Sequence, residues 1–484
     1  MNRGLENIEP REVLKYFEDI SSIPRPSKKE KQISDYLFNF GKFLGIEVVQ
    51  DKNLNIYMRK KATPGYENGK TVMIQAHMDM VCEKNEGTEH DFEKDPLKLR
   101  VIDGKIFATD TTLGADNGIA VAYIMALMSS KDIKHPELEA LITVDEETSM
   151  NGAKTFDPSF FRSKYLLNID SVDDSKLLVS CAGGLKASVT KRVSFEELEG
   201  EVLTIRVRGL KGGHSGIDIN KERGNANKIL ARILMNIEKN YTSVNIVYIS
   251  GGAKDNAIPR ECICQIAVEP CDVNNIILSI KSVEQVIKKE LESEEEFNVL
   301  VSNDEEPLRR NMISIRDSKE LIDLMYLMPN GVKTQSNLMN GLVVTSNNFG
   351  VIEYEGDTVI LKNAIRSSIE SAKYNFVREI DTLGRAFRAV TKESASYPGW
   401  EYNKNSEIRD IAKKVYKEMF GEEMEIYSIH AGVECGIIKD KLPELDMISF
   451  GPIIKDNHTP REWVSIESTN KVWNFLKSVL KEIK

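Results

Sequence analysis

The sequence predicts an α/β protein with a mostly parallel sheet flanked by helices and an inserted α+β domain. Three observations carry this prediction: short apolar runs typical of buried strands, helical patterns that alternate with them, and a length of 484 residues, 41% of them hydrophobic. Single cores stop growing near roughly 250–300 residues, so two domains are expected. The predicted bounds are 1–184 and 396–484 for the two parts of the first domain and 185–395 for the insertion.

Helical and strand patterns alternate along the first part of the chain. Amphipathic spacing predicts helices over residues 10–20 and 28–43, separated by the helix-breaking SIPRPS. The run VMIQA at 72–76 is typical of a strand buried on both faces of a sheet. The same alternation predicts a turn and an apolar helix within 111–130, strands within 137–152, 163–174 and 445–452, and a final helix to about residue 482.

The middle of the chain changes character. Strand alternation runs through residues 186–216, helical spacing follows within 220–237, and a strand pattern returns at 244–252. This order predicts an α+β domain inserted between the two parts of the first domain.

Composition excludes several classes of partner. The net charge of −10 and the isoelectric point near 5.5 argue against nucleic acid or an anionic membrane surface, since both attract clustered Lys and Arg. The N-terminal region has no apolar signal segment, and no stretch approaches the roughly 20 apolar residues of a membrane span. The six scattered cysteines are expected to be reduced thiols. We therefore expect a cytoplasmic protein.

Polar side chains follow the predicted strands where each strand ends. The set comprises His77 and Asp79, Asp116 near a helix N-terminus, the acids Asp145, Glu146 and Glu147, Asp170, and His458 in a loop after the last strand. In open α/β sheets, ligands bind beyond the carboxyl ends of the strands. These groups are therefore expected to converge at one edge of one sheet.

Each of these features alone has an ordinary explanation as capping, a solvated turn or a favourable charge at a helix terminus. The joint placement is what predicts a metal site, because converging carboxylates without a cation would repel one another or take up protons. Histidine and carboxylate ligands without thiolate suit Zn²⁺, Mn²⁺ or Co²⁺. With five or six ligands available, two ions that share a bridging carboxylate are more plausible than one.

Six motifs in order resemble a known family. They are HMD at 77–79, GADNG at 114–118, DEETSMNG at 145–152, NIDS at 168–171, GGHSG at 212–216 and NHTPREWVSIES at 457–468. Together they resemble the M20 (aminoacylase/carboxypeptidase-like) co-catalytic metallopeptidases across nearly the whole chain. HAGVECG at 430–436 and DNAIPREC at 255–262 look most like the long dipeptidase branch of that family.

The resemblance implies a ligand set for two divalent metal ions, Zn²⁺ first, with Mn²⁺ or Co²⁺ possible. His77 and Asp170 would bind one ion, Glu147 and His458 the other, and Asp116 would bridge them.

The resemblance also implies catalytic roles. Asp79 would orient His77 through the ring nitrogen that faces away from the metal. Glu146 would be the general base that takes a proton from the attacking water and passes it to the leaving amine. His214, in the GGHSG turn, would be a lid residue that stabilises the oxyanion, within its own subunit or across a dimer.

Three further residues are carried over as substrate-binding positions: Asn256, Arg366 and Glu434. Arg366 would hold the free C-terminal carboxylate of a dipeptide. The commoner family pattern places Tyr-Pro after this arginine, whereas this sequence has Ser-Ser. A structural role for Glu434 stays open. Of the other histidines, His430 is not expected to bind metal, and His90 and His135 are expected to be solvated.

The expected function is metal-dependent hydrolysis of unblocked dipeptides, including those that end in histidine, by a homodimer formed through the lid domain. An M20-type aminoacylase or tripeptidase would use the same metals with a different pocket. A catalytically inactive metal-binding protein is the third possibility. The presence of Glu146 argues against it, since such a protein needs no base beside the water.

Overall fold

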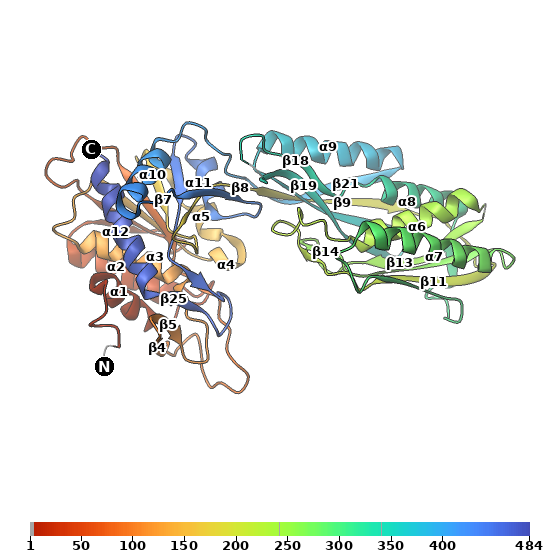
Figure 1. Cartoon of the computed structure of the whole chain (residues 1–484), viewed down its shortest axis with the longest axis horizontal. Helices are drawn as coiled ribbons and strands as arrows, with labels where there is room; N and C mark the ends of the chain where they lie inside the picture. Colours follow the sequence, from red (N-terminus) through yellow and green to blue (C-terminus); the bar gives the residue numbers. More distant parts are fainter. Residues whose placement is uncertain (1–3, 242, 340) are drawn as a thin grey trace. The chain divides into compact units, whose positions relative to one another are not determined.

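The computed structural model describes residues 4–241, 243–339 and 341–484. The chain forms two compact units (Figure 1). The first comprises Met1–Ser180, Trp400–Ser428 and Val433–Lys484, and the second Cys181–Gly399 and Ile429–Gly432. The sequence reasoning placed the boundaries at 184/185 and 395/396 and did not anticipate that residues 429–432 return to the second unit.

The first unit contains an eight-stranded sheet in the order β1-β2-β6-β3-β7-β23-β8-β22. Strands β6, β3, β7 and β23 at its centre are parallel to one another, whereas β1–β2, β2–β6 and β23–β8 are antiparallel pairs. The strands are β1 (Glu47–Gln50), β2 (Ile56–Lys60), β3 (Val72–His77), β6 (Leu138–Thr143), β7 (Tyr165–Asn168), β8 (Lys176–Cys181), β22 (Glu425–Ile429) and β23 (Asp446–Ser449).

The helices of the first unit have these bounds: α1 (Arg11–Ser21), α2 (Lys31–Leu44), α3 (Ala115–Ser129), α4 (Glu146–Ser149), α5 (Asn151–Thr155), the 3₁₀ helix η1 (Pro158–Phe160), α10 (Glu407–Phe420), α11 (Glu434–Lys441) and α12 (Ile466–Glu482). A small sheet joins β24 (Ile454–Lys455), β25 (Trp463–Ser465), β5 (Lys105–Ala108) and β4 (Leu99–Ile102). The helices predicted at residues 10–20, at 28–43 and up to 482 are confirmed.

The central strands and α3 are buried, and most of their residues are apolar. All six residues of β3 and all six of β6 are buried, as expected for parallel strands covered on both faces. Helix α3 contacts α1, α2 and β3 and is buried along almost its entire length. Since β3 and β6 are parallel and His77 pairs with Thr143, their carboxyl ends lie at the same edge of the sheet.

The second unit contains a nine-stranded sheet in the order β16-β11-β15-β13-β19-β20-β9-β21, with β18 paired to β19. Every pairing within it is antiparallel. The strands are β9 (Gly183–Arg192), β11 (Glu201–Arg208), β13 (Val244–Gly251), β15 (Cys262–Val268), β16 (Asn298–Ser302), β18 (Gly331–Gln335), β19 (Val343–Glu355), β20 (Thr358–Ser367) and β21 (Ala389–Tyr397).

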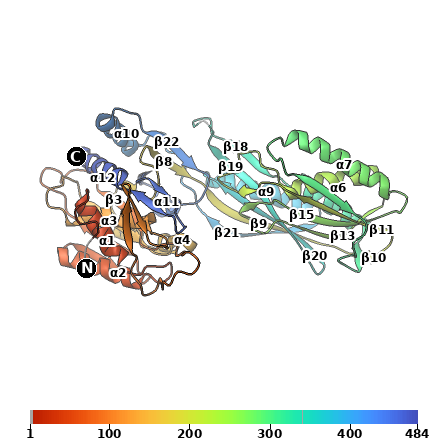
Figure 2. The same ribbon diagram turned by 60° about the horizontal axis from the view of Figure 1, so that its bottom comes forward.

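Four helices pack on this sheet: α6 (Ala226–Asn240), α7 (Val273–Glu290), α8 (Ile315–Leu327) and α9 (Glu370–Ala386). Helices α6 and α7 lie side by side (Figures 1 and 2). Leu203, Ile205 and Val207 of β11 alternate into a core that also takes Leu230 and Leu234 of α6. Two short pairings complete the unit: β10 (Phe195–Glu197) with β17 (Asn311–Ile313), and β12 (Gly213–His214) with β14 (Ala257–Ile258).

Within the described residues, the helices are too short or too polar to cross a membrane.

Candidate metal centre

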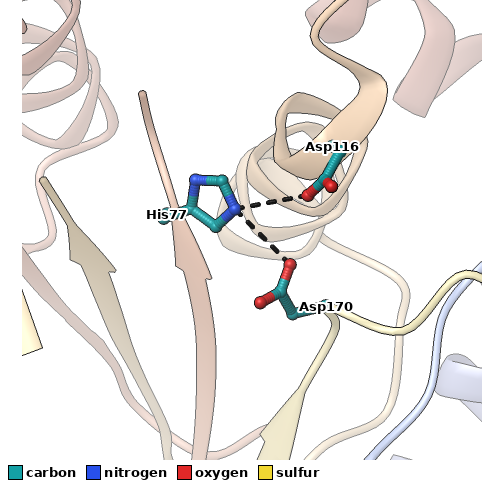
Figure 3. Close-up of side chains that lie close together, drawn as sticks. All are labelled: His77, Asp116 and Asp170. Carbon is teal, nitrogen blue, oxygen red and sulfur yellow. Dashed lines mark ion pairs between the residues drawn. The ribbon is translucent and has the colours of Figure 1, made fainter. Parts of the chain in front are cut away.

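His77 ends β3 and has two carboxylates beside one ring nitrogen (Figure 3). Its Nε2 is 3.4 Å from Oδ1 of Asp116 and 3.5 Å from Oδ1 of Asp170. Asp116 stands at the start of α3, and Asp170 follows β7. Regular helical φ/ψ angles begin only after Asn117, so Asp116 belongs to the loop that leads into the helix. The predicted convergence at the strand ends is therefore observed.

Asp116 also faces the second histidine of the centre. Its Oδ2 is 3.4 Å from Nε2 of His458, and the same nitrogen is 3.1 Å from Oε1 of Glu147. Asn457 donates a hydrogen bond to Oδ2 of Asp116 at 2.9 Å. Each oxygen of Asp116 thus faces a different histidine, which is the geometry that a carboxylate shared by two metal ions needs.

The acidic turn differs from the sequence reasoning, which had Glu146 and Glu147 leaving a strand. Strand β6 ends at Thr143, Asp145 adopts a φ of 52°, and the two glutamates open the four-residue helix α4. Successive helical positions point about 100° apart. The two glutamate side chains therefore diverge because they occupy successive positions of a helical turn.

Asp79 connects His77 to this acidic turn. Its Oδ1 lies 3.4 Å from Nδ1 of His77. The carboxylate also accepts hydrogen bonds from the backbone N–H groups of Glu146 at 3.0 Å and Glu147 at 3.3 Å, and from the Ser27 hydroxyl at 2.7 Å. Asp79 is fully buried, so one side chain fixes both the histidine and the N-terminus of α4.

The charges of the centre perturb one another. Burial raises the pKa of Asp170 to about 6, although His77 opposes this effect. Burial also acts to raise the pKa of Asp116, but hydrogen bonds with His458 and His77 hold it well below its usual range. Hydrogen bonds to Asp116 and Glu147 raise the pKa of His458 to about 10. Burial acts to lower the pKa of His77, but the charge of Asp170 and hydrogen bonds with Asp116, Asp170 and Asp79 together raise it well above its usual value.

The donor set fits divalent metal ions. Among the residues that the structure describes, three groups each place ligand atoms within 4.8 Å of one another: His77, Asp116 and Asp170; His77, Glu146 and Glu147; and Asp116, Glu147 and His458. The first and third groups share Asp116. Imidazole nitrogens and carboxylate oxygens without thiolate suit Zn²⁺, Mn²⁺ and Co²⁺. A cation would also relieve the repulsion between carboxylates that the histidine protons otherwise offset.

Two buried side chains that the sequence reasoning missed support the Asp116 loop. Glu462, 2% exposed, accepts hydrogen bonds at 2.8–3.3 Å from the backbone N–H groups of four consecutive residues, 113–116. Arg25 donates to the carbonyl oxygens of Gly114 at 2.7 Å and Met78 at 3.2 Å. Glu462 follows His458 within one sequence motif, and its closeness to a predicted ligand was the feature of the sequence that could have identified it.

Glu434 lies in the interior of the first unit. It opens α11, is 1% exposed, and accepts hydrogen bonds from Gln75 at 2.6 Å and Thr143 at 2.7 Å. Burial raises its pKa to about 8. These contacts support the ends of β3 and β6, and a contact with substrate stays a prediction.

The remaining predicted residues lie in the second unit. His214 belongs to β12 and Arg366 to β20, and Nε2 of His214 is 3.5 Å from Nη2 of Arg366. Asn256 is exposed, and its carbonyl oxygen accepts a hydrogen bond from the backbone N–H of Ser215 at 2.9 Å. The GGHSG turn, Asn256 and Arg366 therefore lie in one region of this unit.

The other histidines lie outside the candidate centre. His430 is buried in the second unit, with Nε2 2.7 Å from Oγ of Ser346. The expectation that His135 is solvated is wrong, because it is 0% exposed and its backbone pairs with Thr63. His90 is partly buried against Phe92, with ring centroids 4.5 Å apart.

Comparison with known proteins decides the family. The model of peptidase family M20/M25/M40 matches residues 73–482. The chain belongs to this peptidase family. The cytosol non-specific dipeptidase of Escherichia coli (strain K12) is 37% identical over 482 residues, which cover 99% of each chain. The resemblance inferred from the motifs is confirmed.

Solved structures agree with this assignment. Aminoacylhistidine dipeptidase from Vibrio alginolyticus superposes with a TM-score of 0.94 at 35% identity, covering 99% of this M20 peptidase and 98% of that chain. Aminopeptidase PepT from Bacillus cereus ATCC 10987 shares the fold, with a TM-score of 0.57 at 17% identity over 98% and 99% of the two chains.

Metal binding to this M20 peptidase is expected to release protons at neutral pH. The raised pKa values of His77 and His458 keep both imidazoles protonated in the metal-free protein, and each must lose its proton to bind a metal. Affinity should therefore increase with pH. Calorimetric titration of Zn²⁺ into chelator-treated protein, in buffers of different ionisation enthalpy, measures the release. Binding without any proton release would contradict this picture.

Replacing Glu462 by alanine is expected to weaken metal binding roughly 10–100-fold, the usual effect of removing a group that orients ligands. The variant leaves the backbone donors of residues 113–116 without their acceptor. Glu467→Ala, at an exposed position in the first turn of α12 five residues further along the chain, is the matched control. Competition with a chelator measures both affinities, and equal values for the two variants would refute the role of Glu462.

Proposed function

We propose that this M20 peptidase is a metal-dependent dipeptidase that hydrolyses unblocked dipeptides, including those that end in histidine. The observation that carries the proposal is the position of Asp116, whose two oxygens face His77 and His458 separately. Named dipeptidases among the relatives support the choice of substrate class.

The proposed ligands follow the two groups that share Asp116. His77 and Asp170 would hold one ion, Glu147 and His458 would hold the other, and Asp116 would be shared by both. Zn²⁺ is the proposed metal, with Mn²⁺ or Co²⁺ as alternatives, because the ligand atoms are nitrogen and carboxylate oxygen. Two such ions, when bound, would polarise the peptide carbonyl and make the attacking water more acidic.

Glu146 is the proposed general base. Its carboxylate lies with the imidazole of His77 and the carboxylate of Glu147 in one group of close ligand atoms. Burial raises the pKa of Glu146, and Asp170 and Glu434 add to the increase while His77 opposes it. A carboxylate with a raised pKa can hold the proton taken from water long enough to deliver it to the leaving amine. Asp79 keeps both His77 and this glutamate in position.

The second unit supplies three of the proposed substrate contacts, and Glu434 of the first unit is the fourth. His214 donates to the oxyanion, Arg366 binds the C-terminal carboxylate, and Asn256 contacts the peptide. Glu434 is proposed to meet the substrate amino group. We further propose that this unit acts as a lid and forms a homodimer, and that the protein works in the cytoplasm. Sedimentation analysis of the purified protein tests the dimer.

Glu146→Gln is expected to lower kcat by roughly 10²–10⁴-fold, because general-base catalysis contributes about that factor. The variant keeps the proposed metal ligands, so metal content measured by mass spectrometry should stay unchanged. Glu89→Gln, at an exposed position, is the matched control and should retain full activity. Full activity of Glu146→Gln would eliminate it as the base.

Chelator-treated enzyme is expected to regain hydrolysis of alanyl-histidine and β-alanyl-histidine when Zn²⁺, Mn²⁺ or Co²⁺ is added. An N-acetyl amino acid and a tripeptide in the same assay should be cleaved far more slowly, since a dipeptidase recognises both free ends of its substrate. Preferred cleavage of the N-acetyl amino acid would assign an aminoacylase instead, and preferred cleavage of the tripeptide a tripeptidase.

A further inference from the structure

Arg366 is a buried cation surrounded by neutral groups. It is 8% exposed. Its Nε donates to Oγ of Ser215 at 3.3 Å and its Nη1 donates to the Tyr397 hydroxyl at 3.1 Å. Among the described residues, no carboxylate forms an ion pair with this guanidinium. A buried charge without a counterion is unfavourable, so the cluster is built to receive an anion.

The contact between Arg366 and His214 also lacks an acceptor. Nδ1 of His214 accepts the backbone N–H groups of Gly216 and Ile217, both at 3.2 Å. Burial and the charge of Arg366 lower the pKa of His214, so the ring is neutral at neutral pH and its proton lies on Nε2. Nε2–H and Nη2 of Arg366 are then two donors 3.5 Å apart. A ligand oxygen would satisfy both.

Tyr397 reaches this cluster across a neighbouring strand. Arg366 pairs with Gly184 of β9, and Gly184 pairs with Tyr397 of β21. Directly paired residues share one face of a sheet. Because Gly184 has no side chain, the Tyr397 ring lies over β9, with its hydroxyl beside the guanidinium.

Two glycines hold this ring in place. A Cβ on Gly184 would lie 2.5 Å from Cε1 of Tyr397, and a Cβ on Gly432 would lie 2.5 Å from Cε2. Atoms of real side chains do not approach so closely, so any residue larger than glycine would displace the ring. Buried Lys373 fixes the backbone by donating to the carbonyl oxygen of Tyr397 at 2.8 Å.

We propose that Tyr397 and Ser215 complete the carboxylate-binding site around Arg366 and so determine the preference for peptides with a free C-terminus. This inference rests on the proposed function and extends it by two residues. Each hydroxyl accepts a hydrogen bond from Arg366 and keeps its own proton to donate to the bound carboxylate.

The test compares alanyl-histidine with alanyl-histidine amide, which has no free carboxylate, on the metal-reconstituted enzyme. Tyr397→Phe is expected to raise KM for the free acid roughly tenfold with kcat unchanged, and to leave the amide unaffected. Ser215→Ala should act in the same direction. Tyr374→Phe, which removes an exposed hydroxyl 3.2 Å from Ser396, is the matched control and should alter neither substrate.

A second variant guards against a purely structural explanation. Gly184→Ala keeps the tyrosine hydroxyl but displaces the ring, so it should lose the same preference for the free acid. Thermal unfolding of each variant checks that the fold is retained. An unchanged ratio of free acid to amide in Tyr397→Phe would overturn the proposal.

Calorimetric binding of alanyl-histidine separates this proposal from the proposed function. The metal-loaded Glu146→Gln variant should bind the dipeptide roughly tenfold more tightly than Glu146→Gln/Tyr397→Phe does. Wild-type enzyme that cleaves neither peptide would refute the dipeptidase function, while this titration still decides the role of Tyr397. Equal affinities of the two variants, or no binding of alanyl-histidine by Glu146→Gln, would overturn the proposed role of Tyr397.

Discussion

The crowding of carboxylates at the ends of β3, β6 and β7 is the constraint on which the rest of the structure depends. Asp116, Glu147 and Asp170 surround His77 and His458 within a few ångströms. Like charges withdrawn from water repel strongly unless protons or cations neutralise them. The surrounding protein must therefore hold these side chains in a geometry that they would not adopt by themselves, and the buried sheet and α3 provide the rigid support.

Two buried carboxylates contribute to this support by binding backbone N–H groups of the segments that carry the candidate ligands. Asp79 accepts the N–H groups that open α4, and Glu462 accepts those of the loop that carries Asp116. Each carboxylate thereby satisfies backbone donors that would otherwise be unpaired in the interior. The acids of this region thus divide into those that face the centre and those that position its loops. Arg25 strengthens the second set by binding the carbonyl oxygens on the same loops.

Strand periodicity and the residue types after each strand were enough to predict the first unit's parallel strands and the convergence of its candidate ligands. The prediction failed where tertiary contacts override local pattern. The helical turn at Glu146 depends on Asp79, and His135 is buried through its pairing with Thr63. The role of Glu462 depends on a loop more than 300 residues away in sequence. Tyr397 reaches Arg366 only because strands β20, β9 and β21 are neighbours.

The first unit is built from stretches of the chain that lie before and after the second unit, so its parts are synthesised at different times. Residues up to 399 include His77, Asp116, Glu147 and Asp170, but His458 and Glu462 belong to the segment that follows the whole second unit. A chain emerges from the ribosome N-terminus first. A nascent chain can therefore form the early strands and α3 before His458, the last proposed metal ligand, has been synthesised. Glu462, whose carboxylate binds the backbone of the Asp116 loop, is also still missing at that stage. In the proposed ligand set, the ion held by Glu147 and His458 could therefore bind only after translation has delivered the closing segment.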